Sequence, residues 1–186
     1  FDDLLLADDS LQFKASYFDT DAKDYIFMYV TRTQTASANI SRAKIWGWDT
    51  SLNYQTKWFN WDLAYNRTRG KDKSRNGELN AKSGDWLADI SPDTVTSSLD
   101  VPLGETGLSA GWVATFAERA KRVPATYSEQ GGYGVNDFYL SYKGRDRLQG
   151  MTTTVVLGNA FDKEYYSPQG VPQDGRNAKL LVSYQW

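Results

Sequence analysis

The chain has 186 residues, of which 40% are hydrophobic and 15% aromatic, with a formal net charge of −2 and a sequence pI near 5.2. This acidic balance argues against a nucleic-acid partner, which needs a basic protein face. The longest strongly apolar run, residues 25–30, is far shorter than the roughly 20 residues of a spanning helix, which excludes a helical membrane protein.

Alternation of apolar and polar side chains is the dominant pattern of this sequence. It recurs about every 20 to 25 residues, and each segment is typical of a strand with one apolar face. Phe1 resembles the end of a strand that is already under way. The strands that we expect are 11–17, 46–54, 59–66, 94–101, 108–116, 137–142, 151–165 and 178–186.

Short and long connections alternate between these strands. The short ones are expected at 2–10, 55–58, 102–107 and 144–150, and the long ones at 19–39, 67–85, 118–133 and 167–177. Bacterial outer-membrane barrels have this asymmetry, with short periplasmic turns and long extracellular loops. The pattern predicts about eight antiparallel strands in an up-and-down meander, with no linker or second domain.

The last predicted strand carries one apolar side and one mostly polar side. Its length matches the thickness of a bilayer's hydrocarbon layer when the strand is tilted. The sequence therefore predicts an all-β, transmembrane barrel whose apolar face meets lipid and whose polar face meets a lumen. Tryptophans are expected mainly at the two bilayer interfaces. The lipid-facing residues of the last strand are Leu180, Val182, Tyr184 and Trp186; the interfacial tryptophans are Trp46, Trp48, Trp58, Trp61, Trp112 and Trp186.

Two segments carry a family resemblance. Residues 155–166 read V-V-L-G-N-A-F-D-K-E-Y-Y, and residues 175–186 read G-R-N-A-K-L-L-V-S-Y-Q-W. They resemble the C-terminal end of TonB-dependent outer-membrane receptors, although Ala160 stands where many members have Leu. The entry to the last strand is most similar to the haem and haemoglobin receptor branch. Residues 15–26 are similar to a strand-to-loop passage of the same receptors.

The resemblance implies a 22-stranded barrel filled by an N-terminal plug, of which residues 1–186 would be the C-terminal third, without the plug and the earlier strands. It implies the bacterial outer membrane as the location and TonB-dependent, high-affinity uptake of haem or a haem-carrying protein as the function. The implied partners are outer-membrane lipid, the receptor's own plug and remaining strands, the TonB complex and a haem-carrying protein. Haem would be the transported ligand and not a bound cofactor. The chain contains no His, so no haem ligand is assigned.

Candidate site residues follow from the pattern of faces and loops. Tyr25, Tyr29, Tyr127 and Tyr133 are expected in outer loops, where they could contact a ligand. Four acids on the polar face would either line a solute path or, as we prefer, bind Arg or Lys of neighbouring strands or the plug. These acids are Asp49, Asp62, Asp100 and Asp137.

Three other interpretations remain open. One is a ferric-siderophore receptor of the same fold, the second a stand-alone eight-stranded outer-membrane protein, and the third a soluble β-rich module such as a sandwich. An enzyme is not expected, because the chain has neither His nor Cys and offers no Ser/His/Asp set. We assign no catalytic, metal-binding or cofactor-binding residue.

Overall fold

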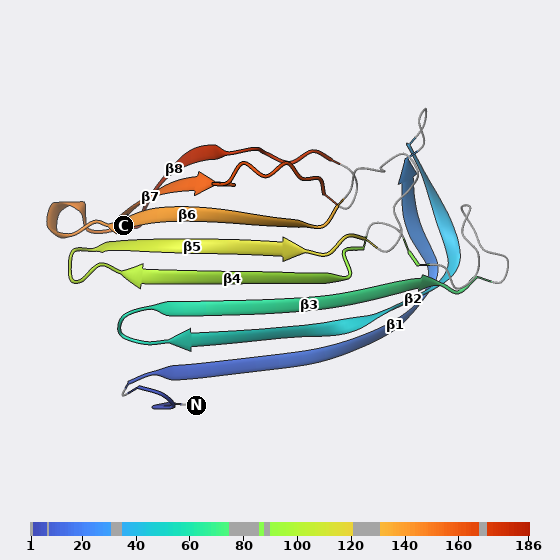
Figure 1. Cartoon of the computed structure of the whole chain (residues 1–186), viewed down its shortest axis with the longest axis horizontal. Helices are drawn as coiled ribbons and strands as arrows, with labels where there is room; N and C mark the ends of the chain where they lie inside the picture. The colour runs from blue at the N-terminus through green and yellow to red at the C-terminus, as the bar shows by residue number, and fades with distance from the viewer. Residues whose placement is uncertain are drawn as a thin grey trace.

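Eight antiparallel strands form one curved sheet in the order of the chain (Figure 1). The computed structural model describes residues 2–6, 8–30, 35–74, 86–87, 90–120, 131–167 and 171–186, with side chains omitted for 27–30 and 35–41. No described helix is long and apolar enough to cross a membrane. The strands are β1 (Ser10–Val30), β2 (Thr35–Gln55), β3 (Asn60–Asp72), β4 (Asp93–Pro102), β5 (Leu108–Ala117), β6 (Tyr133–Lys143), β7 (Met151–Gly158) and β8 (Asn177–Tyr184), with a 3₁₀ turn, η2 (Asp146–Leu148), before β7.

One side of this sheet, which we call the apolar face, carries a continuous row of large side chains. The strand register places Trp61, Leu99, Trp112, Phe138 and Leu157 opposite one another across β3 to β7. Because cross-strand neighbours point to the same side, these residues share one face. The register of the sheet therefore confirms the alternation expected from the sequence.

The apolar face is open to its surroundings. Leu140, Val155 and Leu180, opposite one another on β6, β7 and β8, are 47%, 52% and 69% exposed. Within the described residues no second sheet and no helix layer packs against them. A soluble sandwich would bury such side chains between two sheets, so this arrangement contradicts that interpretation.

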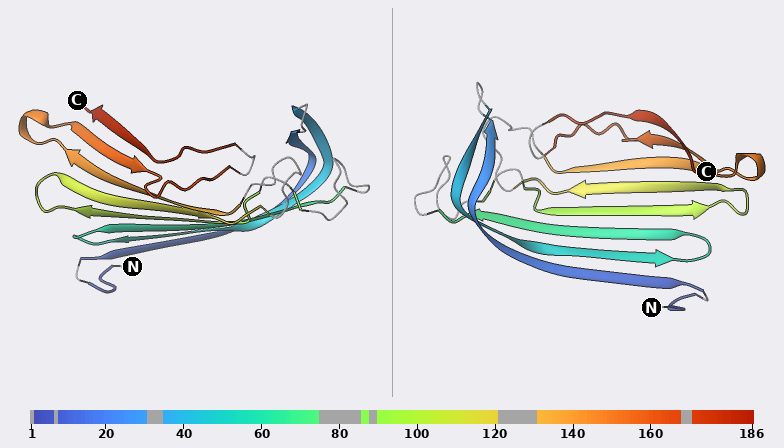
Figure 2. Two further views of the ribbon diagram at one scale, coloured as in Figure 1. Left: turned by 45° about the horizontal axis from the view of Figure 1, so that its top comes forward. Right: turned by 180° about the vertical axis from the view of Figure 1, so that it is seen from behind.

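The far halves of β1 and β2 form a hairpin that reaches beyond the rest of the sheet and bends away from it (Figures 1 and 2). The pairing of β2 with β3 ends at Ala43 and Asp72, whereas β1 and β2 remain paired up to Val30 and Thr35. Within β1, Asp24 has a positive φ of 53°, which departs from extended strand geometry. The prediction of a loop at residues 19–39 was therefore wrong, because most of these residues belong to paired strands.

The strand expected at 151–165 was too long. β7 ends at Gly158, and Asn159 follows with a positive φ of 46°. A left-handed backbone cannot continue a ladder, and Asn tolerates it better than most residues. The last strand is confirmed over Asn177–Tyr184, and Trp186 lies just beyond it, fully exposed.

Candidate functional site: the polar face of the sheet

The two ends of the sheet differ in their connections. The turns at 56–59, 103–107 and 144–150 lie at one end, on the left of Figure 1, and the strand ends Val30, Asp72, Ala117 and Gly158, which lead into the other four connections, lie at the opposite end. We call these the short-turn end and the long-connection end. Three of the four long connections predicted from the sequence, those after β3, β5 and β7, are confirmed, whereas the one predicted between β1 and β2 is not, because only residues 31–34 separate these strands.

Near the short-turn end, the polar face carries a network centred on Asp62. Its carboxylate accepts hydrogen bonds from Asn53 at 2.7 Å, from Asn60 at 3.2 Å and from Ser98 at 3.4 Å. Asn53 also donates to Asn60 at 2.9 Å. Amide and hydroxyl donors therefore hold this acid, and the network joins β2, β3 and β4.

A second acid of the polar face is reached by a tyrosine two strands away. The Tyr139 hydroxyl of β6 donates to Asp100 of β4 at 2.7 Å, and its ring crosses Gly111 of β5. A Cβ atom at Gly111 would lie 2.0 Å from that ring, so only glycine leaves room for the crossing. This contact joins three strands across the polar face.

The remaining two acids are also held by groups other than Arg or Lys. Asp49 accepts a hydrogen bond from the Asn66 side chain, and Asp137 accepts one from the backbone N–H of Asn159 at 2.7 Å. We expected Arg or Lys of neighbouring strands or the plug as partners of the four acids. Within the described residues, the expectation of Arg or Lys from neighbouring strands was wrong. Asn and Ser side chains, the longer Tyr139 side chain and the Asn159 backbone N–H already reach these carboxylates.

An open hollow of about 480 Å³ lies on the polar face over β1 to β4. Small side chains create it, because Ala64 and Thr96 face each other between longer neighbours. Lys14 and Asp49 provide opposite charges at its wall. The polar face is therefore hollowed here and lined mostly by short side chains, an arrangement that suits the interior wall of a barrel.

The long-connection end of the polar face holds an aromatic pair. The rings of Tyr133, the first residue of β6, and Tyr165, in the β7–β8 connection, have centroids 4.6 Å apart at 41°. They line a hollow of about 200 Å³. Burial, with smaller contributions from Tyr133 and Asp137, raises the pKa of the Tyr165 hydroxyl above its ordinary value. The other lining residues are Thr115, Val135, Asp137, Ser167 and Gln173.

A turn stabilised by Asn159 positions Tyr165. The Asn159 side chain is buried, accepts a hydrogen bond from the Lys163 N–H at 2.8 Å and donates to the carbonyl oxygens of Lys163 and Asp174 at 2.8 and 3.1 Å. Asp162 accepts the N–H of Arg176 at 2.8 Å. The N-A-F-D-K segment thus folds the chain back over β6. Through this hydrogen bond Asp162 fixes the entry to β8.

The four tyrosine candidates have different positions. Tyr25 and Tyr29 lie within β1 and not in a loop. Tyr25 is partly buried against a small apolar cluster around Ala43 and Leu87. Tyr127 lies outside the described residues. Tyr133 lies on the polar face, where it contacts Tyr165, a residue that was expected inside a strand.

The comparisons identify the family. A family model described as "TonB dependent receptor-like, beta-barrel" matches residues 1–160. The chain belongs to the TonB-dependent receptors. Such receptors are outer-membrane proteins, which confirms the expected location, and their family is one of transporters and receptors, not an enzyme class. For this family the long-connection end is extracellular and the short-turn end periplasmic.

The TonB-dependent receptors that resemble this chain include two named for hemin. The "Hemin receptor" of Yersinia enterocolitica is 59% identical over 199 residues, covering 100% of this chain and 28% of that protein. The corresponding receptor of Yersinia pestis is 60% identical, covering 100% and 26%. The chain therefore spans little more than a quarter of the length of these relatives.

Solved structures of TonB-dependent receptors share the fold. The copper transporter OprC matches with a TM-score of 0.74 at 20% identity, over 94% of this chain and 29% of its own. The hemophore receptor HasR of Serratia marcescens, solved with the hemophore HasA and heme, matches with a TM-score of 0.67 at 22% identity, over 100% and 29%. At these identities the likeness concerns the fold alone.

Proposed function

We propose that this chain is part of an outer-membrane receptor that imports haem in a TonB-dependent manner. The observation that carries the proposal is the identity of 59% and 60% to two Yersinia hemin receptors over the whole of this chain. Haem is the transported ligand in this proposal. A haem-carrying protein at the cell surface and the TonB complex are its partners.

Within the receptor, we propose that residues 1–186 form the C-terminal third of a 22-stranded barrel around a plug. The single curved sheet supports this, since its polar face is lined by hydrogen-bonded short side chains that suit a protein-filled or hydrated interior. The plug packs against this face, and the Asp62 and Asp100 networks form part of the wall that it contacts.

The Tyr133–Tyr165 pair is our candidate for contact with the ligand. It lies on the polar face at the extracellular end, where a ligand enters the barrel, and its rings offer a flat apolar surface with hydroxyl donors. Tyr25, Tyr29 and Tyr127 remain weaker candidates. A planar macrocycle such as haem is suited to stacking on such rings, without metal coordination from this segment.

Growth of a haem-auxotrophic, receptor-deleted strain tests the proposal. The intact gene containing this segment should restore growth on hemin, and only when TonB is present. Replacing Tyr133 and Tyr165 together with Ala should raise the hemin concentration needed for half-maximal growth about ten-fold, as loss of a binding hot spot does. Tyr17→Ala, on the apolar face, is the matched control, and surface levels of each variant are measured in parallel.

One result would overturn the haem assignment, and another only the role of the aromatic pair. Failure of the intact gene to support growth on hemin, combined with uptake of a ferric siderophore, would assign the receptor to the siderophore class. Normal hemin use by the double tyrosine variant would remove the aromatic pair from the ligand path while leaving the haem assignment in place.

A further inference from the structure

Lys14 of β1 lies on the polar face at mid-depth of the membrane-spanning part of the sheet. On the opposite face, two aromatic contacts flank its level. Towards the extracellular end the rings of Tyr17 and Trp48 have centroids 4.8 Å apart. Towards the periplasmic end those of Tyr54 and Phe59 have centroids 5.8 Å apart. Because the aromatic side chains of barrels gather at the two bilayer interfaces, Lys14 lies between the interfaces and faces the barrel interior.

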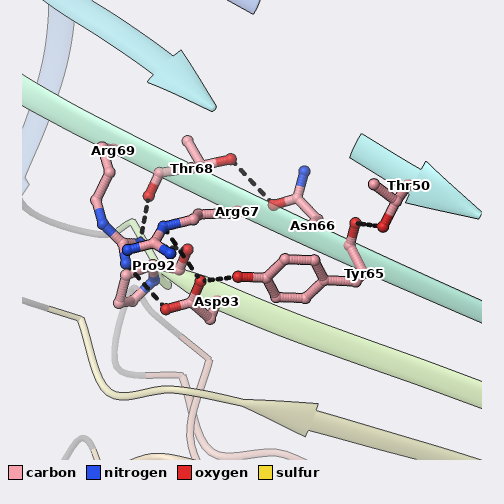
Figure 3. Close-up of polar contacts among 8 residues, drawn as sticks. All are labelled: Thr50, Tyr65, Asn66, Arg67, Thr68, Arg69, Pro92 and Asp93. Atoms are coloured by element: carbon pink, nitrogen blue, oxygen red, sulfur yellow. Dashed lines mark hydrogen bonds and ion pairs between the residues drawn. The ribbon is translucent and has the colours of Figure 1, made fainter. Parts of the chain in front are cut away.

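The charge of Lys14 is not balanced by the part of the chain that the structure describes. No ion pair there involves Lys14. Its diagonal neighbour across β1 and β2 is Asp49, which accepts a hydrogen bond from the Asn66 side chain of β3. Asn66 in turn accepts one from the Thr68 hydroxyl at 3.0 Å (Figure 3). These contacts hold the Asp49 carboxylate towards β3, and a cation without a partner inside a membrane protein marks a path for solutes.

Lys14 belongs to the wall of the hollow over β1 to β4, which we call the wall hollow. Its volume of about 480 Å³ lies within the range of small-molecule sites, about 300–1,000 Å³. Lys14 is the one cationic residue among the described residues that line it. The short side chains of Ala64 and Thr96 face each other on its floor, so a flat ligand can lie against β3 and β4 with one edge at Lys14.

The wall hollow adjoins the smaller hollow of the aromatic pair. Thr96, at the edge of the wall hollow, lies opposite Thr115 of β5, and Thr115 lies opposite Val135 of β6. Thr115 and Val135 line the smaller hollow together with Tyr133 and Tyr165. Short side chains therefore form the boundary at which the two hollows meet.

Towards the periplasm, the wall hollow is bounded by the Asp62 network. Asp62 and Ser98 occupy the next positions of the polar face after Ala64 and Thr96. They are joined to each other, and Asp62 to Asn53, by hydrogen bonds of 3.4 and 2.7 Å. The wall hollow is thus continuous with the aromatic pair and closed by a polar network on its periplasmic side.

We propose that the wall hollow is a second binding site for the transported ligand, which reaches it from the Tyr133–Tyr165 pair and places a carboxylate against Lys14. The site fits a flat organic anion, because its floor is made of short side chains and its one cation stands at the edge. The inference rests on the proposed function, in which the ligand is haem. Haem has this chemistry, with a flat apolar ring and two propionate carboxylates.

Hemin uptake by cells that carry the full-length receptor, compared with hemin binding to the same cells without TonB, tests this inference. Ala64→Trp fills the floor of the wall hollow and should lower uptake about ten-fold, while binding at the outer site stays within about two-fold. Ser141→Trp is the matched control, because Ser141 is a small residue of the polar face on β6, outside the hollow. It should change neither uptake nor binding, and surface levels of all variants are measured in parallel.

A second arm tests the contact between Lys14 and the carboxylate. Lys14→Gln should lower hemin uptake about five-fold, the upper end for an exposed ion pair, and Lys14→Arg should restore it. With the dimethyl ester of hemin, which lacks both carboxylates, the wild type and Lys14→Gln should not differ.

The results also separate this inference from the proposed function. Unchanged hemin uptake by Ala64→Trp, an equal loss in Ser141→Trp, or an equal effect of Lys14→Gln on hemin and its ester would each overturn the second site while leaving haem import in place. A wild-type receptor that imports no hemin would refute the proposed function and this inference with it.

Discussion

At the scale of single residues, Asp9 shows how one carboxylate organises a whole turn. It is buried and accepts the N–H groups of Leu4, Leu5 and Leu6 at 2.6 to 2.9 Å, and the Tyr54 hydroxyl at 2.6 Å. The Tyr54 hydrogen bond is the largest cause that lowers the pKa of Asp9 from 3.8 to about 2, with the three backbone donors assisting. This turn ties residues 2–9 to the end of β2.

The first prediction concerns the pH dependence of this turn. Because the folded pKa of Asp9 is below its ordinary value, the ionised carboxylate stabilises the turn fully above about pH 4, and this contribution is lost as the pH falls towards 2. Hydrogen exchange of the Leu4–Leu6 amides, corrected for intrinsic rates, should show protection that declines over that range. In Asp9→Asn the protection should be lower at neutral pH and nearly independent of pH. A decline of equal size in the variant would contradict the assignment.

Residue-scale features were only partly predictable. The N-A-F-D-K segment could be recognised as a family pattern, but not as a turn held by the Asn159 amide. The strand predicted over 151–165 extended past Gly158, so the turn was missed and Tyr165 was placed in a strand. A positive φ at a non-glycine residue leaves no periodic signal, although Asn followed by Asp three residues later was a usable hint.

At the scale of elements, alternation located strands well where they cross the membrane and failed where they leave it. In β1 the outward residues up to Tyr17 are apolar, whereas Asp19, Asp21 and Lys23 continue the same row. Beyond the lipid no apolar face is required, so the ladder of hydrogen bonds continues while the hydrophobic pattern ends. This is why residues 19–39 were predicted as loop although the described part of them is strand.

Two neighbouring residues of β5 lie on opposite faces of the sheet and allow a matched test. Trp112 lies on the apolar face, and its neighbour Val113 lies on the polar face opposite Ser98 and Asp137. Trp112 lies midway along β5, so we place it nearer the bilayer centre than the interface expected from the sequence. Trp112→Arg should therefore destabilise the inserted barrel by about 2–4 kcal/mol, the cost of an arginine facing lipid near the bilayer centre. Val113→Arg is the matched control and should cost much less, because it faces the polar interior. Urea-induced unfolding of the full receptor in bilayers measures both.

At the scale of the whole molecule, the eight strands form one curved sheet with no described layer against its apolar side (Figure 2). The fold, the eight strands and their meander order were predictable from the alternation of faces and of connection lengths. The polar networks were not, because a hydrogen bond such as that of Tyr139 to Asp100 spans 39 residues and depends on the register of three strands. Sequence periodicity sets the face of a residue but not its partner.

The central claim is that the apolar face meets lipid while the polar face lines the interior. The 186 residues contain no Cys, so single Cys substitutions can carry a nitroxide label in this segment of the full receptor. The apolar-face sites are Leu140, Val155 and Leu180, and the polar-face sites are Ser141 and Thr154, which lie opposite each other.

The most direct test measures collisions of these labels with oxygen, which dissolves in lipid, and with a water-soluble nickel chelate, in reconstituted bilayers. We predict high oxygen and low nickel accessibility at Leu140, Val155 and Leu180, and low oxygen accessibility at Ser141 and Thr154. Oxygen accessibility that does not alternate between Leu140 and Ser141, or that is higher at Ser141, would contradict the account.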